Sequence, residues 1–335
     1  MTGSTRRLLA VAAVLLSACT QGGSSGVRVG AESGSGGGLV VPTDRGAVRG
    51  ALAGQVRTFL GIPYAAPPVG GLRWRPPQVH SAWSGVRDAT QFGSPCPQIA
   101  GQGNPGSTDE DCLLLNVYTP AQAHRGEQLP VMVWIHGGAL ETGAGSLYDP
   151  AQLVAHGVIV VTINYRLGAL GFLADPAFSS GASGNYGMMD QIAALRWTQR
   201  NIREFGGDSR NVTIFGQSAG GLSVLTLLVS PLAHGLFTKA IEESGAYSLV
   251  SLQLVEATQS EANAGGVAFA TAVGCVGGSA TCLRRVPVAS LLAHQASKGY
   301  APHIDGKVLT QSIGAALDSG AFARVPLIVG SNRDE

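Results

Sequence analysis

The chain has 335 residues, of which 13% are charged and 45% are hydrophobic, and its formal net charge is +1. This composition excludes a largely disordered chain, and the balanced charge leaves no electrostatic footprint for nucleic acid. The 48 glycines follow no G-X-Y period, which excludes collagen.

Residues 1–18 resemble a bacterial lipoprotein signal. Arg6 and Arg7 precede an apolar run of 11 residues, 8–18, which is too short for a membrane-spanning helix of about 20 residues. The run ends in Leu-Ser-Ala before Cys19, which resembles a lipobox, where the chain is cut before a diacylated Cys. We therefore expect Cys19 to be lipidated. The alternative is an ordinary secretory peptide that is cleaved nearby.

Residues 19–38 are predicted to be a tether. Gly and Ser occupy 12 of the 19 positions from 20 to 38, which indicates a flexible segment with a root-mean-square span of roughly 25 Å. We expect an exported protein that is anchored by lipid on the outer face of the cell membrane. Secretion is the alternative.

Four further cysteines lie in the body of the chain, at Cys96, Cys112, Cys275 and Cys282. Three pairings are open, and the one that joins sequence neighbours gives Cys96–Cys112 and Cys275–Cys282. The first of these loops would contribute about 3 kcal/mol in the chain-entropy model. Four reduced thiols are the alternative, which an oxidising compartment disfavours. No motif with zinc-ligand spacing occurs, so no metal is expected.

Apolar runs typical of strands alternate with helical patterns along the chain. The predicted strands are Val131–Ile135, Val158–Asn164, Val212–Phe215, Lys239–Glu243 and Pro326–Gly330. The predicted helices are Asp190–Phe205, Leu222–Leu228 and Glu256–Val273. The alternation predicts one α/β unit over 39–335, with a mostly parallel sheet, helices on both faces and an irregular N-terminal part. No nucleotide-binding motif occurs, so no cofactor is expected.

The segment from Gly216 to Gly220 has the pattern G-x-S-x-G around Ser218. It follows a predicted strand and precedes a predicted helix, which is the context of a nucleophile elbow. The pattern alone is weak, because residues 22–26 of the tether match it too. An alternative role for Ser218 is that of a helix N-cap.

A second glycine-rich turn, from His136 to Ala139, follows the predicted strand Val131–Ile135. Acyl transfer places negative charge on the carbonyl oxygen, and pre-aimed backbone N–H groups stabilise that charge. A glycine-rich loop after an early strand, together with the N–H that follows the nucleophile, is the hydrolase arrangement. A plain tight turn would explain the glycines, but it would not explain why a strand and a glycine-rich loop come together upstream of Ser218.

Four segments together resemble the type B carboxylesterase family, which includes para-nitrobenzyl esterases, carboxylesterases and cholinesterases. The segment FGGDSRNVTIFGQSAG, Phe205–Gly220, resembles the serine signature of that family. The segment EDCLLLNVYTP, Glu110–Pro120, resembles its second signature, with Leu114 where Tyr or Thr is usual. Phe59–Ala65 and Gly184–Gln191 fit as well.

The resemblance implies an α/β-hydrolase fold and both disulfides between sequence neighbours. It also implies an oxyanion hole made by the N–H groups of Gly138, Ala139 and Ala219. Two ion pairs follow in the same way, Arg73 with Glu110 and Arg166 with Asp190. The alternative is a pair of solvated surface contacts worth under about 1 kcal/mol each.

The same resemblance narrows the substrate class. Cholinesterases carry an aromatic residue for the choline cation in the first disulfide loop, but residues 97–111 contain none. Gln217 stands where cholinesterases have an acidic residue before the serine. A binding site for a cation needs an aromatic ring face or a carboxylate. Since neither is found here, we expect neutral carboxylic esters as the substrates.

The segment from Gly330 to Glu335 resembles the acid motif of the family, so Glu335 is the predicted triad acid. The triad order is Ser, acid, His, and no residue follows Glu335. We therefore expect a partial hydrolase domain that lacks the last strand, its covering helices and the triad His, with apolar sheet surface uncovered. It would be a partial record, a truncated product or one part of a split enzyme that a second polypeptide completes.

Two functions follow. The first is a serine hydrolase of small-molecule carboxylic esters that forms an acyl-enzyme. The second is a non-catalytic, surface-binding lipoprotein on a hydrolase scaffold, but that role predicts loss of the nucleophile or the oxyanion loop, and both are present. The sequence therefore favours the hydrolase.

Overall fold

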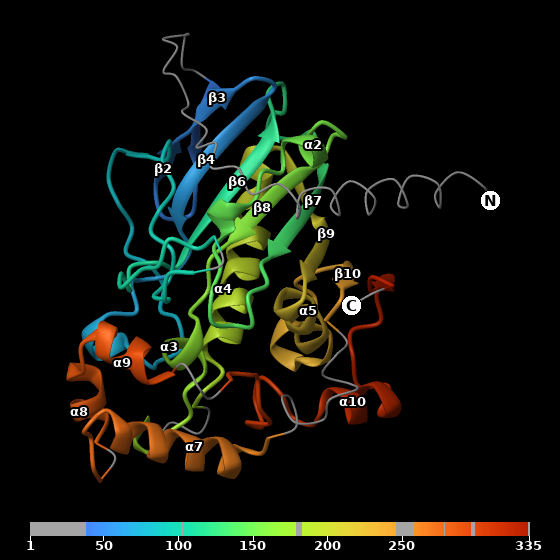
Figure 1. Cartoon of the computed structure of the whole chain (residues 1–335). Coiled ribbons are helices and arrows are strands. Elements are labelled where there is room, and N and C mark those ends of the chain that lie inside the picture. Colours follow the sequence, from blue (N-terminus) through green and yellow to red (C-terminus); the bar gives the residue numbers. More distant parts are fainter. Residues whose placement is uncertain are drawn as a thin grey trace.

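The computed structural model describes residues 38–101, 103–178, 183–245, 257–277, 279–295 and 299–333. The predicted export signal with Cys19, nearly all of the tether and Glu335 lie outside these residues. Figure 1 shows a twisted sheet with helices packed along it and a group of helices below one end of the strands.

A large sheet organises the described residues. Its strands are β3 Ala51–Ala53, β4 Val56–Pro63, β6 Leu114–Pro120, β7 Leu129–Ile135, β8 Ile159–Ile163, β9 Gly207–Gln217, β10 Lys239–Glu243 and β11 Leu327–Gly330. They lie in the order β11-β10-β9-β7-β8-β6-β4-β3. Strands β7 to β11 are parallel to one another, whereas β3, β4 and β6 pair in antiparallel fashion. The predicted mostly parallel sheet is confirmed.

The five predicted strands all form. The strand predicted at Val212–Phe215 is longer, Gly207–Gln217, and the other four differ by at most two residues at either end. The prediction of an irregular N-terminal part is wrong, because β3 and β4 extend the large sheet and a second, three-stranded sheet also forms there. The strands of this second sheet are β1 Val40–Pro42, β2 Ala47–Arg49 and β5 Val86–Asp88. These strands are only three residues long, so they give too little periodicity to be recognised in the sequence.

The helices cover both faces of the large sheet, as predicted. Their bounds are α2 Ala151–Val154, α3 Gly168–Phe172, α4 Tyr186–Asn201, α5 Ala219–Val229, α7 Gln259–Ala272, α8 Ala280–Arg285, α9 Val288–Gln295 and α10 Ile313–Ser319. Short 3-10 helices span Gly70–Leu72, Gly145–Leu147, Pro176–Phe178, Ile202–Phe205 and Pro231–Ala233. Each of the three predicted helices corresponds to one of these, α4, α5 or α7.

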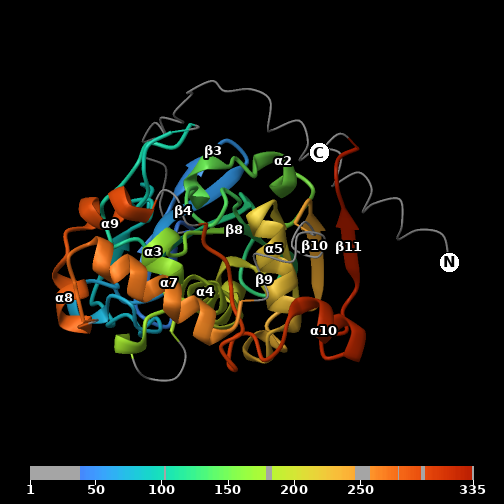
Figure 2. The ribbon, with the colours of Figure 1, turned by 60° about the horizontal axis from the view of Figure 1, so that its bottom comes forward.

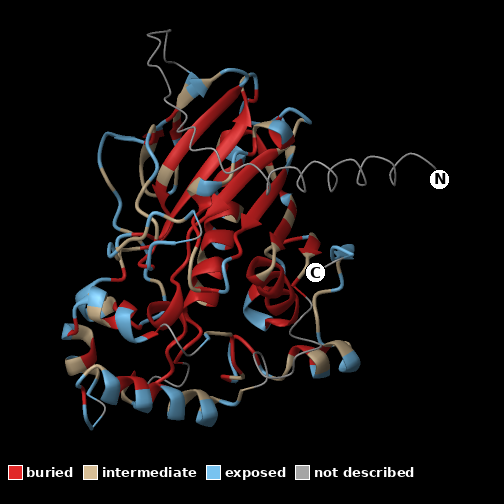
Figure 3. Cartoon of the chain, viewed as in Figure 1, coloured by how far each residue is buried: buried red, intermediate tan, exposed pale blue. Residues whose placement is uncertain are grey.

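Strand β7 shows why a central strand of this sheet consists of consecutive apolar residues. Val133 and Ile135 belong to the main core, which also contains residues of α4 and α5. Met132 and Trp134 point to the opposite face, where Leu153 of α2 packs with them. Because successive side chains of a strand alternate between the faces, coverage on both sides buries every residue from 131 to 135 (Figure 3).

A separate apolar cluster supports the helices at the end of the strands. Phe269 of α7, Leu283 of α8 and Leu291 of α9 pack with Leu170 of α3 and with Trp74. The disulfide Cys275–Cys282 joins the segment after α7 to α8. The other disulfide, Cys96–Cys112, closes the loop before β6. Both pairings implied by the family resemblance are confirmed.

Both predicted ion pairs form; Arg166–Asp190 is buried and Arg73–Glu110 is largely buried, with side chains 8% and 11% exposed. Arg73 donates to the two carboxylate oxygens of Glu110 at 2.7 and 2.5 Å. Arg166 donates to the two oxygens of Asp190 at 2.7 Å each, and the two side chains are 3% and 0% exposed. The alternative of solvated surface pairs is therefore wrong. Such two-pronged contacts are geometrically specific, and their loss leaves a buried charge without compensation.

The outermost strand in the described part of the sheet is β11, which pairs with β10 on one side (Figure 2). Its residues Leu327, Ile328 and Val329 are 42%, 38% and 55% exposed. Apolar sheet surface is therefore uncovered there, as expected. Among the described residues, no helix is both long enough and apolar enough to cross a membrane.

We predict that Asp190→Asn lowers the free energy of unfolding by about 3–5 kcal/mol, because Arg166 would keep a buried charge without its counter-ion. The matched control is Asp208→Asn, since Asp208 pairs with Arg210, whose side chain is 70% exposed; we expect a change within about 0.5 kcal/mol there. Urea unfolding of the three proteins measures both values. Equal effects of the two substitutions would contradict the argument.

Candidate active site

Strand β9 passes directly into helix α5 at Ser218, which has φ 56° and ψ −124°. This backbone conformation is rare for a residue with a side chain and costs roughly 1–3 kcal/mol. Ser218 stands at the N-cap position, but its side chain makes no capping hydrogen bond. The observed geometry is the abrupt strand-to-helix turn of a nucleophile elbow, with the serine half-buried at its apex.

The turn is held by close backbone contacts. The N–H of Ser218 donates to the carbonyl of Glu243 on the neighbouring strand β10 at 2.8 Å. Gly220 lies so close to β7 that a Cβ atom there would stand 2.1 Å from the carbonyl oxygen of Ile135. Any side chain at 220 would therefore push α5 away from the sheet, and the turn could not stay this tight.

The loop after β7 has three successive residues with positive φ, at Gly138 (106°), Ala139 (56°) and Leu140 (59°). Within the described part of the chain, the N–H groups of Gly138 and Ala139 have no hydrogen-bond acceptor. Both residues are exposed. The N–H of Ala219 is the first of α5, and a helix leaves its first four N–H groups without an intrahelical acceptor.

The loop and the turn lie against each other. A Cβ atom added to Gly137 would stand 2.7 Å from the carbonyl oxygen of Gln217 and 3.3 Å from Cβ of Ser218. The predicted site residues Ser218, Gly138, Ala139 and Ala219 therefore come together at one end of the sheet. Such a set of backbone donors beside a serine can stabilise an oxyanion. The predicted acid, Glu335, lies outside the described residues.

His136 fixes the start of the loop. Its ring is fully buried, stacks on Tyr165 with the ring centroids 4.4 Å apart, and has Nδ1 2.8 Å from the carbonyl of Gly137. The hydroxyl of Tyr165 donates to the main-chain carbonyl of His136 at 2.7 Å. Burial lowers the pKa of His136 to about 4, against the opposing effect of the Gly137 hydrogen bond. His136 is therefore neutral at pH 7, with Nδ1 donating to Gly137.

All seven histidines are among the described residues, and none has a hydrogen bond to Ser218 there. His303 is 2% exposed and its backbone N–H and C=O both bond the side chain of Asn185. Its ring lies in the interior, with Nε2 3.4 Å from the side-chain oxygen of Gln259. The structure brings a serine hydroxyl and backbone donors together, and no histidine of the described residues bonds to that serine.

Sequence reasoning missed Glu243. It ends β10, beside the turn, and its carbonyl accepts the N–H of Ser218. Burial, reinforced by the charge of the neighbouring Glu242, raises the pKa of its carboxyl to about 7. The available signal was two consecutive glutamates at the end of a predicted strand, since parallel strands end at the same edge of a sheet.

No group of three or more His, Cys, Asp or Glu side chains in the described ranges could hold a metal ion.

Comparison with known proteins gives a consistent result. Residues 38–335 match the family described as the carboxylesterase family. The chain is 43% identical over 312 residues to fumonisin B1 esterase of Sphingopyxis macrogoltabida, covering 89% of this chain and 56% of that protein. It is 47% identical over 307 residues to human cocaine esterase, covering 86% of this chain and 53% of that protein.

Among solved structures, a PNB esterase superposes with a TM-score of 0.82 at 40% identity. The match covers 89% of this chain and 63% of that one. The chain thus spans between half and two thirds of the length of these relatives.

We predict that His136 makes the fold sensitive to acid. Its pKa is about 4 in the folded chain and 6.5 ordinarily, so the unfolded state binds the additional proton between these values. Stability from this group is complete above pH 6.5 and falls as the pH drops towards 4, by about 3 kcal/mol in all.

The measurement is urea unfolding at pH 7 and pH 4.5 for the wild type, His136→Gln and the control His124→Gln, whose histidine side chain is 76% exposed. The wild type and the control should lose more stability than His136→Gln on acidification. The same pH dependence in all three would refute the assignment.

Proposed function

This chain belongs to the carboxylesterase family, and from that premise we propose that it hydrolyses neutral carboxylic esters through an acyl-enzyme on Ser218. One observation carries the proposal. The strained turn at Ser218 lies against a loop whose N–H groups at Gly138 and Ala139 have no acceptor in the described part of the chain. Strained backbone conformations cluster at active sites, so a strained serine beside N–H groups without acceptors supports a catalytic role.

In the proposed reaction, the hydroxyl oxygen of Ser218 attacks the acyl carbon while a base accepts its proton. The carbonyl oxygen becomes an oxyanion that accepts hydrogen bonds from the N–H groups of Gly138, Ala139 and Ala219. Removal of one such donor typically lowers kcat by about 10²- to 10³-fold. The alcohol then leaves with a proton, and water hydrolyses the acyl-enzyme in a second step of the same kind.

The acid and base complete the proposal. Glu335, which matches the acid motif of the family, is proposed to orient the base. Since none of the seven histidines bonds to Ser218 among the described residues, we propose that the base is a histidine of a further segment. That segment would belong to a longer form of this polypeptide or to a second polypeptide. The greater length of the relatives supports this part of the proposal.

Neutral esters are proposed as substrates because the disulfide loop offers no aromatic face to a cation. Residues 97–111 contain no aromatic residue, and Gln217 provides no carboxylate beside the nucleophile. Relatives act on different esters, as the names fumonisin B1 esterase and cocaine esterase indicate. The acyl and alcohol groups that this chain accepts are therefore left open in the proposal.

The proposed location is the outer face of the cell membrane, through lipid on Cys19 and a tether to residue 38, with secretion as the alternative. The charged start, the short apolar run and the small residues before Cys19 support it. The anchor would hold the hydrolase near the membrane without entering its chemistry.

We predict that a fluorophosphonate probe labels Ser218 of the full chain slowly and that Ser218→Ala abolishes the adduct. The backbone donors can stabilise the charge that develops on the phosphoryl oxygen, but the serine hydroxyl is a weak nucleophile while the proposed base is missing. Intact mass and peptide mapping locate the adduct. The control is Ser260→Ala, at an exposed serine of α7, which should leave labelling unchanged. A folded chain with no adduct on Ser218 would favour the non-catalytic scaffold.

We predict that Cys19→Ser releases the protein from the membrane fraction, since it removes the only thiol near the apolar run. One acyl chain binds a membrane only marginally, whereas several anchor it firmly. Fractionation followed by immunoblotting measures the change. If the variant stays in the membrane fraction to the same extent as the wild type, the lipid-anchor proposal is wrong.

A further inference from the structure

Gln98 lies inside the Cys96–Cys112 loop, and it is 2% exposed although its side chain is a polar amide. Each of its hydrogen-bonding groups has a partner. Its backbone N–H and C=O pair with Ser107 at 3.0 and 2.9 Å. Its side-chain Nε2 donates to the carbonyls of Cys96 and Gly143 at 3.0 and 2.8 Å, and its Oε1 accepts the N–H of Gly143 at 2.8 Å.

The Gln98 side-chain amide donates to the carbonyl of Gly143 and accepts its N–H, so it satisfies both backbone groups of that residue as a neighbouring strand would. Gly143 ends the oxyanion loop, has φ 114°, and touches the start of the same loop. A Cβ atom there would stand 2.3 Å from Nδ1 of His136 and 2.8 Å from the carbonyl oxygen of Gly137. A shift of Gly143 therefore transmits directly to the residues beside Gly138.

The loop needs an external support, because its own conformation is unfavourable. Ala139 and Leu140 have φ values of 56° and 59°, and each such residue costs about 1–2 kcal/mol. Inside the loop, the carbonyl of Gly138 accepts the N–H groups of Glu141 and Thr142 at 2.9 Å. This closes the turn on itself but does not fix its position relative to Ser218.

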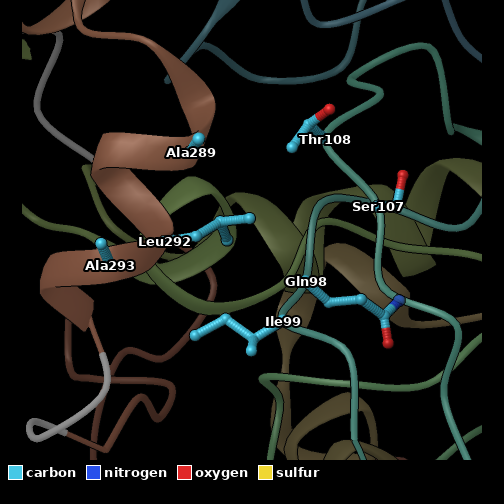
Figure 4. A pocket seen from close by; sticks show the side chains of 7 residues that line it. All are labelled: Gln98, Ile99, Ser107, Thr108, Ala289, Leu292 and Ala293. Carbon is cyan, nitrogen blue, oxygen red and sulfur yellow. The ribbon is translucent and has the colours of Figure 1, made fainter.

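Helix α9 does not pack tightly against the segment around Gln98, so it cannot hold Gln98 in place. A shallow cavity of about 500 Å³ separates the disulfide loop from α9. Figure 4 shows Ile99 and Leu292 on its two sides and the Gln98 side chain extending away from the helix. Because atoms that face a gap lose their dispersion partners, hydrogen bonds carry more of the restraint at this point.

We propose that Gln98 is a positioning residue that sets the oxyanion donors Gly138 and Ala139 through its paired hydrogen bonds to Gly143. This inference rests on the proposed function, since it assigns Gln98 a role in acylation of Ser218. A displacement of the donors by about 1 Å can cost on the order of 10²-fold in rate. Gln98→Ala should therefore slow acylation about tenfold to a hundredfold and leave the affinity for the reagent unchanged.

The experiment uses the full chain and four proteins, namely the wild type, Gln98→Ala, Gln98→Glu and the control Gln78→Ala. Gln78 is an exposed glutamine whose amide bonds only to Pro76 among the described residues. The rate of adduct formation on Ser218 is measured at a series of fluorophosphonate concentrations. This gives the maximal labelling rate and, separately, the probe concentration at which half of that rate is reached. Amide hydrogen exchange of the peptide that covers residues 137–143 is measured in parallel, with melting temperature as the fold control.

Gln98→Glu distinguishes positioning from a merely structural role. An ionised carboxylate only accepts, so it repels the carbonyl of Gly143, whereas a protonated one can donate to and accept from Gly143, with no second donor left for the carbonyl of Cys96. Relative to the wild type at each pH, the Glu variant should therefore recover its rate as the pH falls, and Gln98→Ala should not.

Slower labelling and faster exchange in Gln98→Ala, with wild-type values in Gln78→Ala, would support the proposal. Equal labelling rates in all four proteins would overturn it. If no protein labels, the proposed function fails, and the exchange measurement alone then decides the inference. Unchanged exchange at 137–143 in Gln98→Ala would overturn it in that case, and faster exchange would support the restraint on the loop.

Discussion

The close approach of α5 to the end of β7 is the constraint on which the site depends. Gly220 has no side chain, and the carbonyl oxygen of Ile135 occupies the place of its Cβ atom. This contact lets the chain turn within one residue from strand to helix, and it forces Ser218 into its rare conformation. Burial of every residue of α5 offsets the strain. The buried helix α5 and its contact with β7 therefore hold the serine in place.

The donors beside the serine depend on the same kind of arrangement. The loop at Gly138 and Ala139 is strained and exposed, yet His136 at its start is buried against Tyr165. Backbone N–H groups that point outward in this way carry a partial positive charge without a charged side chain. The oxyanion site proposed here would follow from backbone geometry, so it would be sensitive to every contact that fixes the loop.

Buried arginines join segments that are distant in the sequence. Arg166 follows β8, pairs with Asp190 of α4 and also donates to the carbonyl of Arg75 at 2.9 Å. Arg73 donates to the carbonyl of Val286 at 2.7 Å besides its pair with Glu110. Desolvation of such charges offsets much of their attraction. Their effect is therefore to specify which segments meet, because any other arrangement would leave a buried guanidinium without its acceptors.

The parallel strands, the main helices, the serine at the turn and the glycine-rich loop could be predicted from the sequence alone, because each has a local pattern of apolar spacing or fixed glycines. Residues 40–63 were not recognised as strands, since β1, β2 and β3 have only three residues each and β4 shows no regular alternation of polar and apolar residues. The partners of Gln98 and Glu243 became visible only in the structure. The contacts of these two residues with Gly143 and Ser218 join residues 45 and 25 positions apart, and no local pattern encodes a hydrogen bond that tertiary packing creates.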